Sequence, residues 1–415
     1  MAGVPMQQIR LNKYGNFDHE SKERVLVLFK NPERWNEHVL DILSTEYSLV
    51  HGYFGEIFAG LGTRQLLELV KKVRNDFGII SVLIDPEWCD TCNVSVIKRL
   101  DEIVPVGLML FDDNTMHDYN LIVGSAASYV LCGCPMGVYR YRSFDITTEY
   151  FVPISSRVYD VEEQPPEFDV SWFGFPNKAD RQVYIQALRE QRRFTTDIHT
   201  GETHGDKSMS GDISFRELAE RIKRSRISVN LSRSDFPMRC WPYHGMPRAE
   251  MYQVSGRIIE VGLSGRLCVS QYSPCHELLG FSGYLREFET PEGMLSLLSD
   301  LLRGDLASET RRYVDFTREK FGAHVLAENA RRAIDQSLKS SDRYPTRVTQ
   351  TYYQIAAGAL QRTFANNPAL RDEELALLNE VCSMVQLDFK GSDGQRLSGR
   401  KIPIMRPVPR QRHGA

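Results

Sequence analysis

Short, continuously apolar runs recur through the first half of the chain and alternate with segments of helical periodicity. Clear examples of these runs are 24–29, 79–84 and 106–111. A strand that is apolar at every position, rather than at every second one, is typical of a parallel sheet with both faces covered. Helical spacing in 33–43 and 63–73 supplies the covering layers. This alternation predicts a doubly wound α/β domain.

A second unit of the same kind is predicted around residues 225–280. Ile227, Val229 and Leu231 alternate with polar residues at the two-residue period of a strand, and a polar loop follows. Residues 256–263 then have the pattern of a short helix, which ends at a glycine before an apolar strand at 265–270. Strand, loop, helix and strand form a βαβ unit, and such sheets bind ligands at the carboxyl ends of their strands.

Arg257 and Glu260 lie in the early turns of this predicted helix. The free N–H groups and the dipole of a helix start favour phosphate, and an arginine adds a bidentate donor. Glu260 can accept hydrogen bonds from ribose hydroxyls. The alternative is an exposed helix start with a local ion pair that contributes little. The flanking glycines and the strand that carries Asn230 favour a site for a nucleotide diphosphate.

Residues 256–260, followed by Gly265 and Glu277, resemble the sugar-nucleotide-binding segment of GT-B glycosyltransferases. The resemblance is strongest to the CgeB-like, spore-maturation branch of the group 1 enzymes. The strand 225–232 is similar to the "SKI-x-LN-x-S" strand of that branch, and the order of elements in the first half is similar too. This resemblance implies an α/β fold with two Rossmann-like domains facing a cleft and a C-terminal helix that crosses back over the cleft. The extra C-terminal helices that the sequence predicts lie beyond this minimal fold.

Three positions depart from that family pattern. Ser255 stands where many relatives have a lysine, and Tyr252 stands where the paired-glutamate motif has its other acid. The loop 271–274 lacks the usual acid or glycine-rich turn. These departures leave open a protein that binds a nucleotide sugar without turning it over.

The length of 415 residues and the ordinary composition fit a two-domain globular protein. An acidic stretch with Pro165-Pro166 predicts the linker. Residues 195–211 are predicted as a loop, 307–338 as one helical stretch, and 348–364 and 372–385 as further helices. The predicted divisions are a partly ordered N-terminus at 1–22, an acceptor-side domain at 23–160, a linker at 161–168, a nucleotide-sugar domain at 169–340, additional helices at 341–390 and a basic, disordered tail at 391–415.

The predicted donor-binding residues lie at strand ends and helix starts of the second domain. Gly174, Asn177 and Arg181 fall where its first strand meets its first helix, and an ordinary surface turn is as good an interpretation there. Ser232 and Ser234 follow another strand, where helix capping is the alternative. The predicted donor set is Arg257, Glu260, Gly256, Asn230, Ser232, Gly174, Arg181 and Glu277.

Asp112, Asp113 and His117 follow a strand of the first domain and are the candidates for a catalytic base. An inverting transferase needs a base for the acceptor hydroxyl, whereas a retaining one mainly needs support for the leaving diphosphate. The alternative for either aspartate is to cap the next helix. Asp85, at the end of an earlier strand, has the same two interpretations.

Cys89 and Cys92, with Cys132 and Cys134, invite a zinc hypothesis. The second pair has the wrong gap for a usual zinc knuckle and no histidine is near, so reduced core thiols are the favoured interpretation. His199 and His204 fall in a polar stretch and are predicted to be solvent-exposed. We therefore expect neither a metal nor a cofactor.

The net charge of −3 gives no argument for nucleic acid, and no run is long enough to span a membrane. A cytoplasmic protein is predicted. From Gly394 onward the chain carries six cations and no acid, so this tail could contact anionic lipid, although a solvated tail is the simpler interpretation.

The sequence predicts a glycosyltransferase that moves a sugar from a nucleotide-diphosphate donor to an acceptor it does not identify. The alternatives are a non-catalytic binding protein and a nucleotide-sugar epimerase or hydrolase on the same fold.

Overall fold

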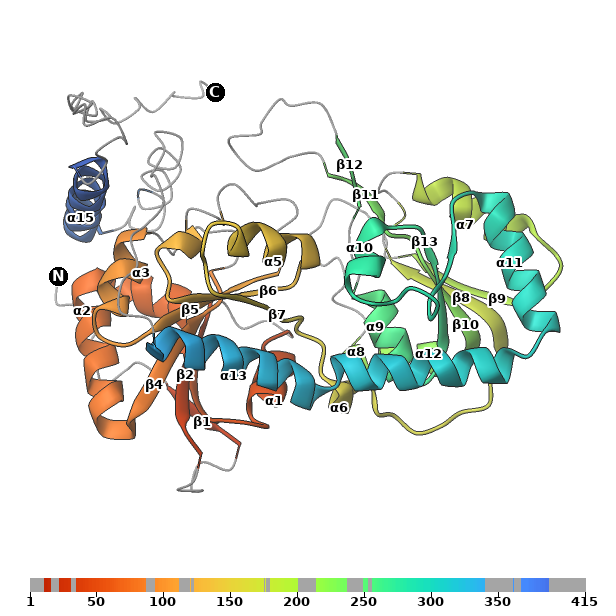
Figure 1. Ribbon diagram of the computed structural model, residues 1–415, viewed down its shortest axis with the longest axis horizontal. Coiled ribbons are helices and arrows are strands. Elements are labelled where there is room, and N and C mark those ends of the chain that lie inside the picture. The colour runs from red at the N-terminus through yellow and green to blue at the C-terminus, as the bar shows by residue number, and fades with distance from the viewer. Residues whose placement is uncertain are drawn as a thin grey trace, which may run out of the picture.

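A computed structural model shows two sheets side by side, joined along one side by long helices (Figure 1). The structure describes residues 11–15, 22–30, 35–86, 94–111, 120, 123–174, 176, 180–200, 214–236, 249–252, 256–339, 361 and 367–387.

The first sheet is built from the N-terminal half of the chain. Its strands are β1 (Asn12–Tyr14), β2 (Arg24–Phe29), β3 (Ser48–Tyr53), β4 (Ile79–Ile84), β5 (Val106–Leu110), β6 (Tyr129–Cys132) and β7 (Thr148–Tyr150), and the helices of this half are α1 (Trp35–Leu43), α2 (Phe54–Phe77), α3 (Val94–Asp101), α5 (Pro135–Arg142) and α6 (Ser156–Tyr159). The strand order is β1-β3-β2-β4-β5-β6-β7, and β1 alone runs antiparallel to its neighbour. We call this sheet and its helices the first unit.

The second sheet is entirely parallel, in the order β14-β13-β10-β8-β9. The strands of this half are β8 (Phe168–Gly174), β9 (Thr196–Thr200), β10 (Ser225–Asn230), β13 (Leu267–Gln271), β14 (Arg286–Phe288) and a separate hairpin of β11 (Arg233–Phe236) with β12 (Ala249–Tyr252). Its helices are α7 (Arg181–Glu190), α8 (Phe215–Lys223), α9 (Arg257–Leu263), α10 (Pro274–Leu278), α11 (Pro291–Arg303) and α12 (Leu306–Phe321). We call this sheet and its helices the second unit.

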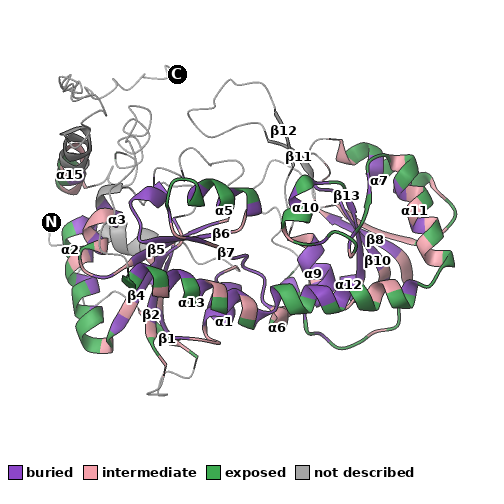
Figure 2. Cartoon of the chain, viewed as in Figure 1, coloured by how far each residue is buried: buried purple, intermediate pink, exposed green. Residues whose placement is uncertain are grey.

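The apolar runs of the sequence become strands buried on both faces, as predicted. In β2, Val25 and Val27 enter one core cluster, whereas Leu26 and Leu28 enter another on the opposite face of the sheet. Successive strand residues point to opposite faces, so a continuous apolar run is what a doubly covered strand requires. Figure 2 shows the buried strands between more exposed helices.

The helices α12 and α13 (Ala323–Lys339) run one after the other along both units (Figure 1). The sequence predicts one helical stretch at 307–338, but the helix breaks at Gly322, whose backbone is extended. Helix α12 packs on α9 and β13 of the second unit, and α13 packs on α1, β6 and β7 of the first. The break therefore lies where the chain passes back from one unit to the other.

A continuous apolar cluster extends through the junction of the two units. The Trp35 ring of α1 lies 4.5 Å from the Phe215 ring of α8, and the His38 ring lies 4.3 Å from Phe215. His38 also accepts a hydrogen bond from the Ser155 backbone N–H at 2.9 Å. These contacts fix one side of the junction between the two units.

Helix α15 (Pro368–Leu387) docks on the first unit at a break in α2. Gly62 has φ +68° there, and the following Thr63 donates from both its N–H and its hydroxyl to the buried Glu374 carboxylate, each at 2.5 Å. Burial raises the pKa of Glu374. The sequence predicts a helix at 372–385, which falls within α15.

Several local predictions differ from the structure. Residues 196–200 of the predicted loop form strand β9, whose half-exposed, largely polar residues at the sheet edge lack an apolar run. The polar loops predicted around β11, β12 and α10 also contain regular structure. The helix predicted at 348–364 lies outside the described residues, apart from position 361.

Within the described part of the chain, no helix combines the length and the apolar character needed to cross a membrane.

Candidate functional site

The carboxyl ends of β8, β10 and β13 meet at one edge of the second sheet, because these neighbouring strands are parallel. Helix α9 leads into β13, so it begins at this same edge. The predicted donor-binding residues therefore do converge: Gly174 ends β8, Asn230 ends β10, and Gly256 and Arg257 begin α9.

Arg257 and Glu260 form an ion pair across the first turn of α9. The Arg257 Nε atom lies 3.2 Å from a Glu260 carboxylate oxygen. The Arg257 side chain is 16% exposed and that of Glu260 only 6%. The pair is thus largely removed from water, where charges interact more strongly than on the surface. It is not the exposed helix start of the alternative interpretation.

The Arg257 guanidinium lies over the ring of Phe173, 5.5 Å from its centre. Phe173 is the second-last residue of β8, so this cation–π contact joins the helix start to the end of a neighbouring strand. Gly256 lies against Ile154, which lies between β7 and α6 of the first unit. A Cβ atom at position 256 would lie 2.9 Å from the Ile154 side chain. The Arg257–Glu260 pair therefore sits at the junction of the units.

Close packing on α12 holds α9 in place. A Cβ atom at Gly262 would approach Thr317 to 2.4 Å, so only glycine lets the two helices come this near. The Tyr313 hydroxyl donates to the backbone carbonyl of Ile258. Behind the ion pair lies the buried thiol of Cys268, and burial raises its pKa to about 12. The floor of the site behind the ion pair is therefore uncharged and closely packed.

Asn230 and Ser232 use their polar groups inside the sheet edge. The Asn230 side-chain amide donates to the Ser270 hydroxyl at 2.8 Å, and the Ser232 hydroxyl donates to the Gln271 carbonyl at 2.7 Å. Both residues are at least 97% buried. Their hydrogen bonds tie the end of β10 to the end of β13, so in this structure the two side chains hold the sheet edge together.

Arg181 and its neighbour Asp180 extend the same network. Arg181 donates to the Leu231 carbonyl at 3.0 Å, and the Gln271 amide donates to the Asp180 carboxylate at 3.1 Å. Gly174 has φ +153°, a conformation that favours glycine, at the point where β8 ends. The start of α7 is thereby tied to the ends of β10 and β13.

Glu277 lies on α10, which follows β13 at the same edge, and its side chain is exposed. The preceding His276 is buried, and its Nδ1 atom lies 2.6 Å from the Glu287 carboxylate of the β14 strand. The His276–Glu287 pair, Phe173 and Ile154 are missing from the sequence-based set. Only the polar character of the loop around His276 could have drawn attention to it, since its partner lies eleven residues away.

The three candidates for a catalytic base, Asp112, Asp113 and His117, lie outside the described residues. Asp85 is described at the end of β4, where its N–H donates to the Leu28 carbonyl at 2.9 Å. The position of a catalytic base therefore stays a prediction.

For the zinc hypothesis, Cys89 and Cys92 also fall outside the described residues. Cys132 is buried, and its sulfur accepts from the Cys134 N–H at 3.4 Å. Over the ranges that the structure describes, no cluster of three or more histidine, cysteine or acidic side chains could hold a metal. His199 is half-buried on β9 and touches Arg221 at 3.5 Å, whereas His204 is not described.

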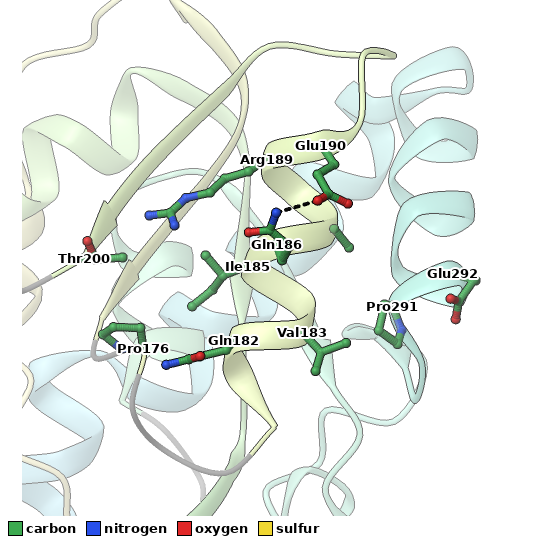
Figure 3. Close-up of a pocket in the computed structure, with 11 residues that line it drawn as sticks. Pro176, Gln182, Val183, Ile185, Gln186, Arg189, Glu190, Thr200, Pro291 and Glu292 are labelled. Carbon is green, nitrogen blue, oxygen red and sulfur yellow. Dashed lines mark hydrogen bonds between the residues drawn. The ribbon is translucent and has the colours of Figure 1, made fainter.

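Two surface hollows do not coincide with the converging strand ends. One, of about 700 Å³, lies along α7 between Thr200 and the start of α11, and Gln186 and Glu190 bond to each other on its floor (Figure 3). The other, of about 440 Å³, lies beside the α12–α13 break. None of the eight predicted donor-binding residues lines either hollow. The candidate site is therefore identified by the polar residues at the sheet edge with Arg257 and Glu260, and not by the size of a hollow.

No family model and no curated protein matches the chain. Solved structures do match it. A glycosyltransferase from Rickettsia africae superposes with a TM-score of 0.53 at 9% identity, over 77% of this chain and all of that one. Sucrose-phosphate synthase from Thermosynechococcus elongatus gives 0.52 at 10% identity, over 77% and 100%. HepE from Anabaena, solved with UDP, gives 0.52 at 10% identity, over 75% and 99%.

These similarities, at such low identity, concern the fold. The chain has the predicted α/β GT-B architecture, with two Rossmann-like units and a C-terminal helix that returns to the first unit.

Proposed function

We propose that this protein is a glycosyltransferase that takes a sugar from a nucleotide-diphosphate donor held at the carboxyl edge of the second sheet. The observation that carries the proposal is the Arg257–Glu260 pair, which is desolvated, anchored by packing and placed at the junction of the units. A structural ion pair needs none of these three properties. The similarity to a solved glycosyltransferase supports the proposal at the level of the fold.

In this proposal the two side chains divide the donor between them. The Arg257 guanidinium carries five N–H donors in a planar fork, whose geometry suits phosphate oxygens as well as a carboxylate. In this proposal the fork binds the diphosphate, whose charge grows as the sugar leaves. The Glu260 carboxylate can accept hydrogen bonds from ribose hydroxyls. Each group orients the other before the donor arrives, which lowers the cost of binding.

The acceptor would enter from the first unit, with the base among the residues after β5. In this proposal the units close by a change of angle at the α12–α13 break at Gly322, with the aromatic contact of Trp35 with Phe215 as the pivot. Closure would exclude water from the reacting sugar. We expect no metal or cofactor to take part, and a cytoplasmic location remains a prediction of the sequence.

The test is a thermal-shift screen of the purified protein with UDP-, GDP-, dTDP- and CDP-linked sugars and the free diphosphates. HepE was solved with UDP, so the uridine series comes first. A ligand that binds the native state raises the melting temperature. We expect a shift with one base that Arg257→Ala abolishes.

The matched control is Arg303→Ala, which removes another arginine from an i, i+3 pair with an acid, on the exposed face of α11. This variant should keep the full shift. The donor site would be refuted if none of the nucleotides shifted the melting temperature, or if both variants lost the shift equally.

A binding protein without turnover is the second candidate. Glu260 is 6% exposed and already paired with Arg257, so the site could bind a nucleotide sugar without catalysing its transfer. Release of free nucleotide from the bound donor would exclude this candidate. Conversion of the donor sugar without any acceptor would instead indicate an epimerase or hydrolase.

A further inference from the structure

The smaller of the two hollows, of about 440 Å³, lies where the units join. Its walls come from α6 of the first unit, from the ends of α9 and α12 of the second, and from the start of α13. We call it the hinge hollow, because it includes the α12–α13 break. Its volume lies in the usual range of ligand pockets, about 300–1,000 Å³. The lining residues are Ser156, Arg157, Asp160, Leu263, Arg318, Gly322, Ala323 and His324.

The hinge hollow is separate from the candidate donor site. Helix α9 begins with Arg257 at the carboxyl edge of the second sheet and ends with Leu263 in the hollow. A helix of this length spans about 10 Å, so one short helix connects the two places. In Figure 1, α6 and the α12–α13 break lie well below α10, which follows the strand ends. The proposed function therefore makes no use of the hollow.

Two basic side chains of the hollow have no protein partner within the described ranges. The side chains of Arg318 and His324 are exposed, and neither makes a hydrogen bond or an ion pair with a described residue. By contrast, Arg312 on the same helix lies 2.8 Å from the Glu309 carboxylate. An unpaired arginine beside a hollow has its five N–H donors available for an anion.

Arg157 brings a second guanidinium from the other unit. One of its nitrogens lies 3.4 Å from the Asp41 carboxylate, and its side chain is 62% exposed. This long contact orients the arginine and leaves most of it open to the hollow and to solvent. Phosphate has several oxygens that accept hydrogen bonds from guanidinium groups, so arginines from two units can share one phosphate.

The lining is not uniformly positive. The Asp160 carboxylate and the Ser156 hydroxyl also line the hollow, and over the described ranges neither side chain has a hydrogen-bond partner. A carboxylate repels a bare phosphate but accepts hydrogen bonds from hydroxyl groups. The buried Leu263 and Ala323 add apolar surface. The hollow therefore suits a molecule with both a phosphate and hydroxyl groups better than it suits inorganic phosphate.

We propose that the hinge hollow binds a small phosphorylated sugar or polyol, with its phosphate on Arg157 and Arg318 and its hydroxyl groups on Asp160. These contacts come from both units, so the bound molecule holds the units at the angle of this structure. It thereby opposes closure and weakens binding of the nucleotide sugar. This regulatory part rests on the proposed function, whereas the binding itself needs neither donor nor turnover.

The experiment is isothermal titration calorimetry of the full chain with glucose 6-phosphate, inorganic phosphate and glucose, at constant ionic strength. The hollow variant is Arg318→Ala. Its matched control is Arg311→Ala, which removes another exposed arginine of α12. Arg311 also has no partner among the described residues, and it does not line the hollow. A third variant, Asp160→Asn, tests the hydroxyl contact.

We expect the wild type to bind glucose 6-phosphate more tightly than inorganic phosphate, and glucose not measurably. Arg318→Ala should bind glucose 6-phosphate about tenfold more weakly, which is the effect of losing one charge-assisted hydrogen bond. The control should bind like the wild type. Asp160→Asn should bring the affinities for the two phosphates closer together, because an amide repels phosphate less than a carboxylate does.

Three results would overturn the binding site. The first is a wild type that binds neither phosphate. The second is an equal loss of affinity in Arg318→Ala and Arg311→Ala, which would indicate a general effect of surface charge. The third is loss of glucose 6-phosphate in Arg257→Ala but not in Arg318→Ala, because the probe would then bind at the donor site.

The regulatory part is tested with the preferred nucleotide sugar. Saturating glucose 6-phosphate should weaken its binding about fivefold, and the nucleotide sugar should weaken glucose 6-phosphate by the same factor, because coupling between sites is reciprocal. Arg318→Ala should bind the nucleotide sugar normally and lose this effect. Unchanged affinities would refute the regulation. A wild type that binds glucose 6-phosphate and no nucleotide would refute the transferase and leave the hinge hollow as a binding site.

Discussion

Two sets of polar side chains meet at the carboxyl edge of the second sheet, and they use their polar groups in different ways. Asn230 and Ser232 are almost fully buried and bond to Ser270 and the Gln271 backbone. Arg257 and Glu260 bond to each other, and the arginine remains partly exposed. The first set holds the edge together, whereas the second is the one that the proposed function assigns to a ligand. Nearness to a strand end alone therefore does not identify a binding residue.

The largest expected effect separates the two sets directly. Arg257→Ala should weaken binding of the preferred nucleotide diphosphate by about 100-fold, because charge-assisted hydrogen bonds contribute about 1.5–3 kcal/mol each. Arg257→Lys keeps the charge but loses the planar fork, so its affinity should lie between those of the wild type and Arg257→Ala. Isothermal titration calorimetry measures all three proteins. Equal affinities for alanine and wild type would show that the pair is structural.

The next effect tests the role of Glu260. If its carboxylate accepts from the ribose, the wild type should bind a ribonucleoside diphosphate about tenfold more tightly than the 2′-deoxy form, because a lost partner leaves a polar group unsatisfied. Glu260→Gln should reduce this preference. The same preference in both proteins would move the ribose contact to another residue.

Asn230→Ala should affect stability and leave binding unchanged. Removal of its side chain leaves the buried Ser270 hydroxyl without its donor, which costs about 1–2 kcal/mol of unfolding free energy. Chemical denaturation measures this loss, and titration with nucleotide well below the melting temperature should give the wild-type affinity. A strong loss of affinity in a stable variant would transfer Asn230 to the ligand-binding set.

The smallest effect concerns the thiol behind the site. The pKa of Cys268 in the folded protein is about 12, above the ordinary value of 9.0, so the thiol stays protonated while the protein is folded. Because the pKa is raised on folding, the protonated thiol contributes fully to the free energy of unfolding below pH 9. This contribution is lost as the pH rises toward 12. Iodoacetamide at neutral pH should modify the half-buried Cys134 in the folded protein and the buried Cys268 only after unfolding. Mass spectrometry identifies the modified cysteine.

Sequence periodicity predicted most of the fold for a physical reason. Strands such as β2 and β4 are buried on both faces, so their own composition specifies their environment. Strand β9 was missed because an edge strand is only half-buried and its polar residues resemble a loop. Helix α10 was missed because it has five residues and depends on the Ser273 cap and on Pro274.

The site was predictable only in part. Arg257 and Glu260 are three residues apart on one helix, so local spacing alone brings them together. The contacts that surround the start of α9 come from Phe173, which lies under the Arg257 guanidinium, and Ile154, which lies against Gly256. These two residues precede Arg257 by about 84 and 103 positions, and no local pattern marks them. The three candidate bases, Asp112, Asp113 and His117, remain predictions.

The sequence by itself determined the alternation of strands and helices, the βαβ unit and the pairing of Arg257 with Glu260, because each depends on neighbours within one or two turns. Only the tertiary structure decided which polar residues face inward, where the long C-terminal helix breaks, and which helices of the two units pack on each other. Those features depend on contacts between distant segments, and a linear pattern does not record which segments meet.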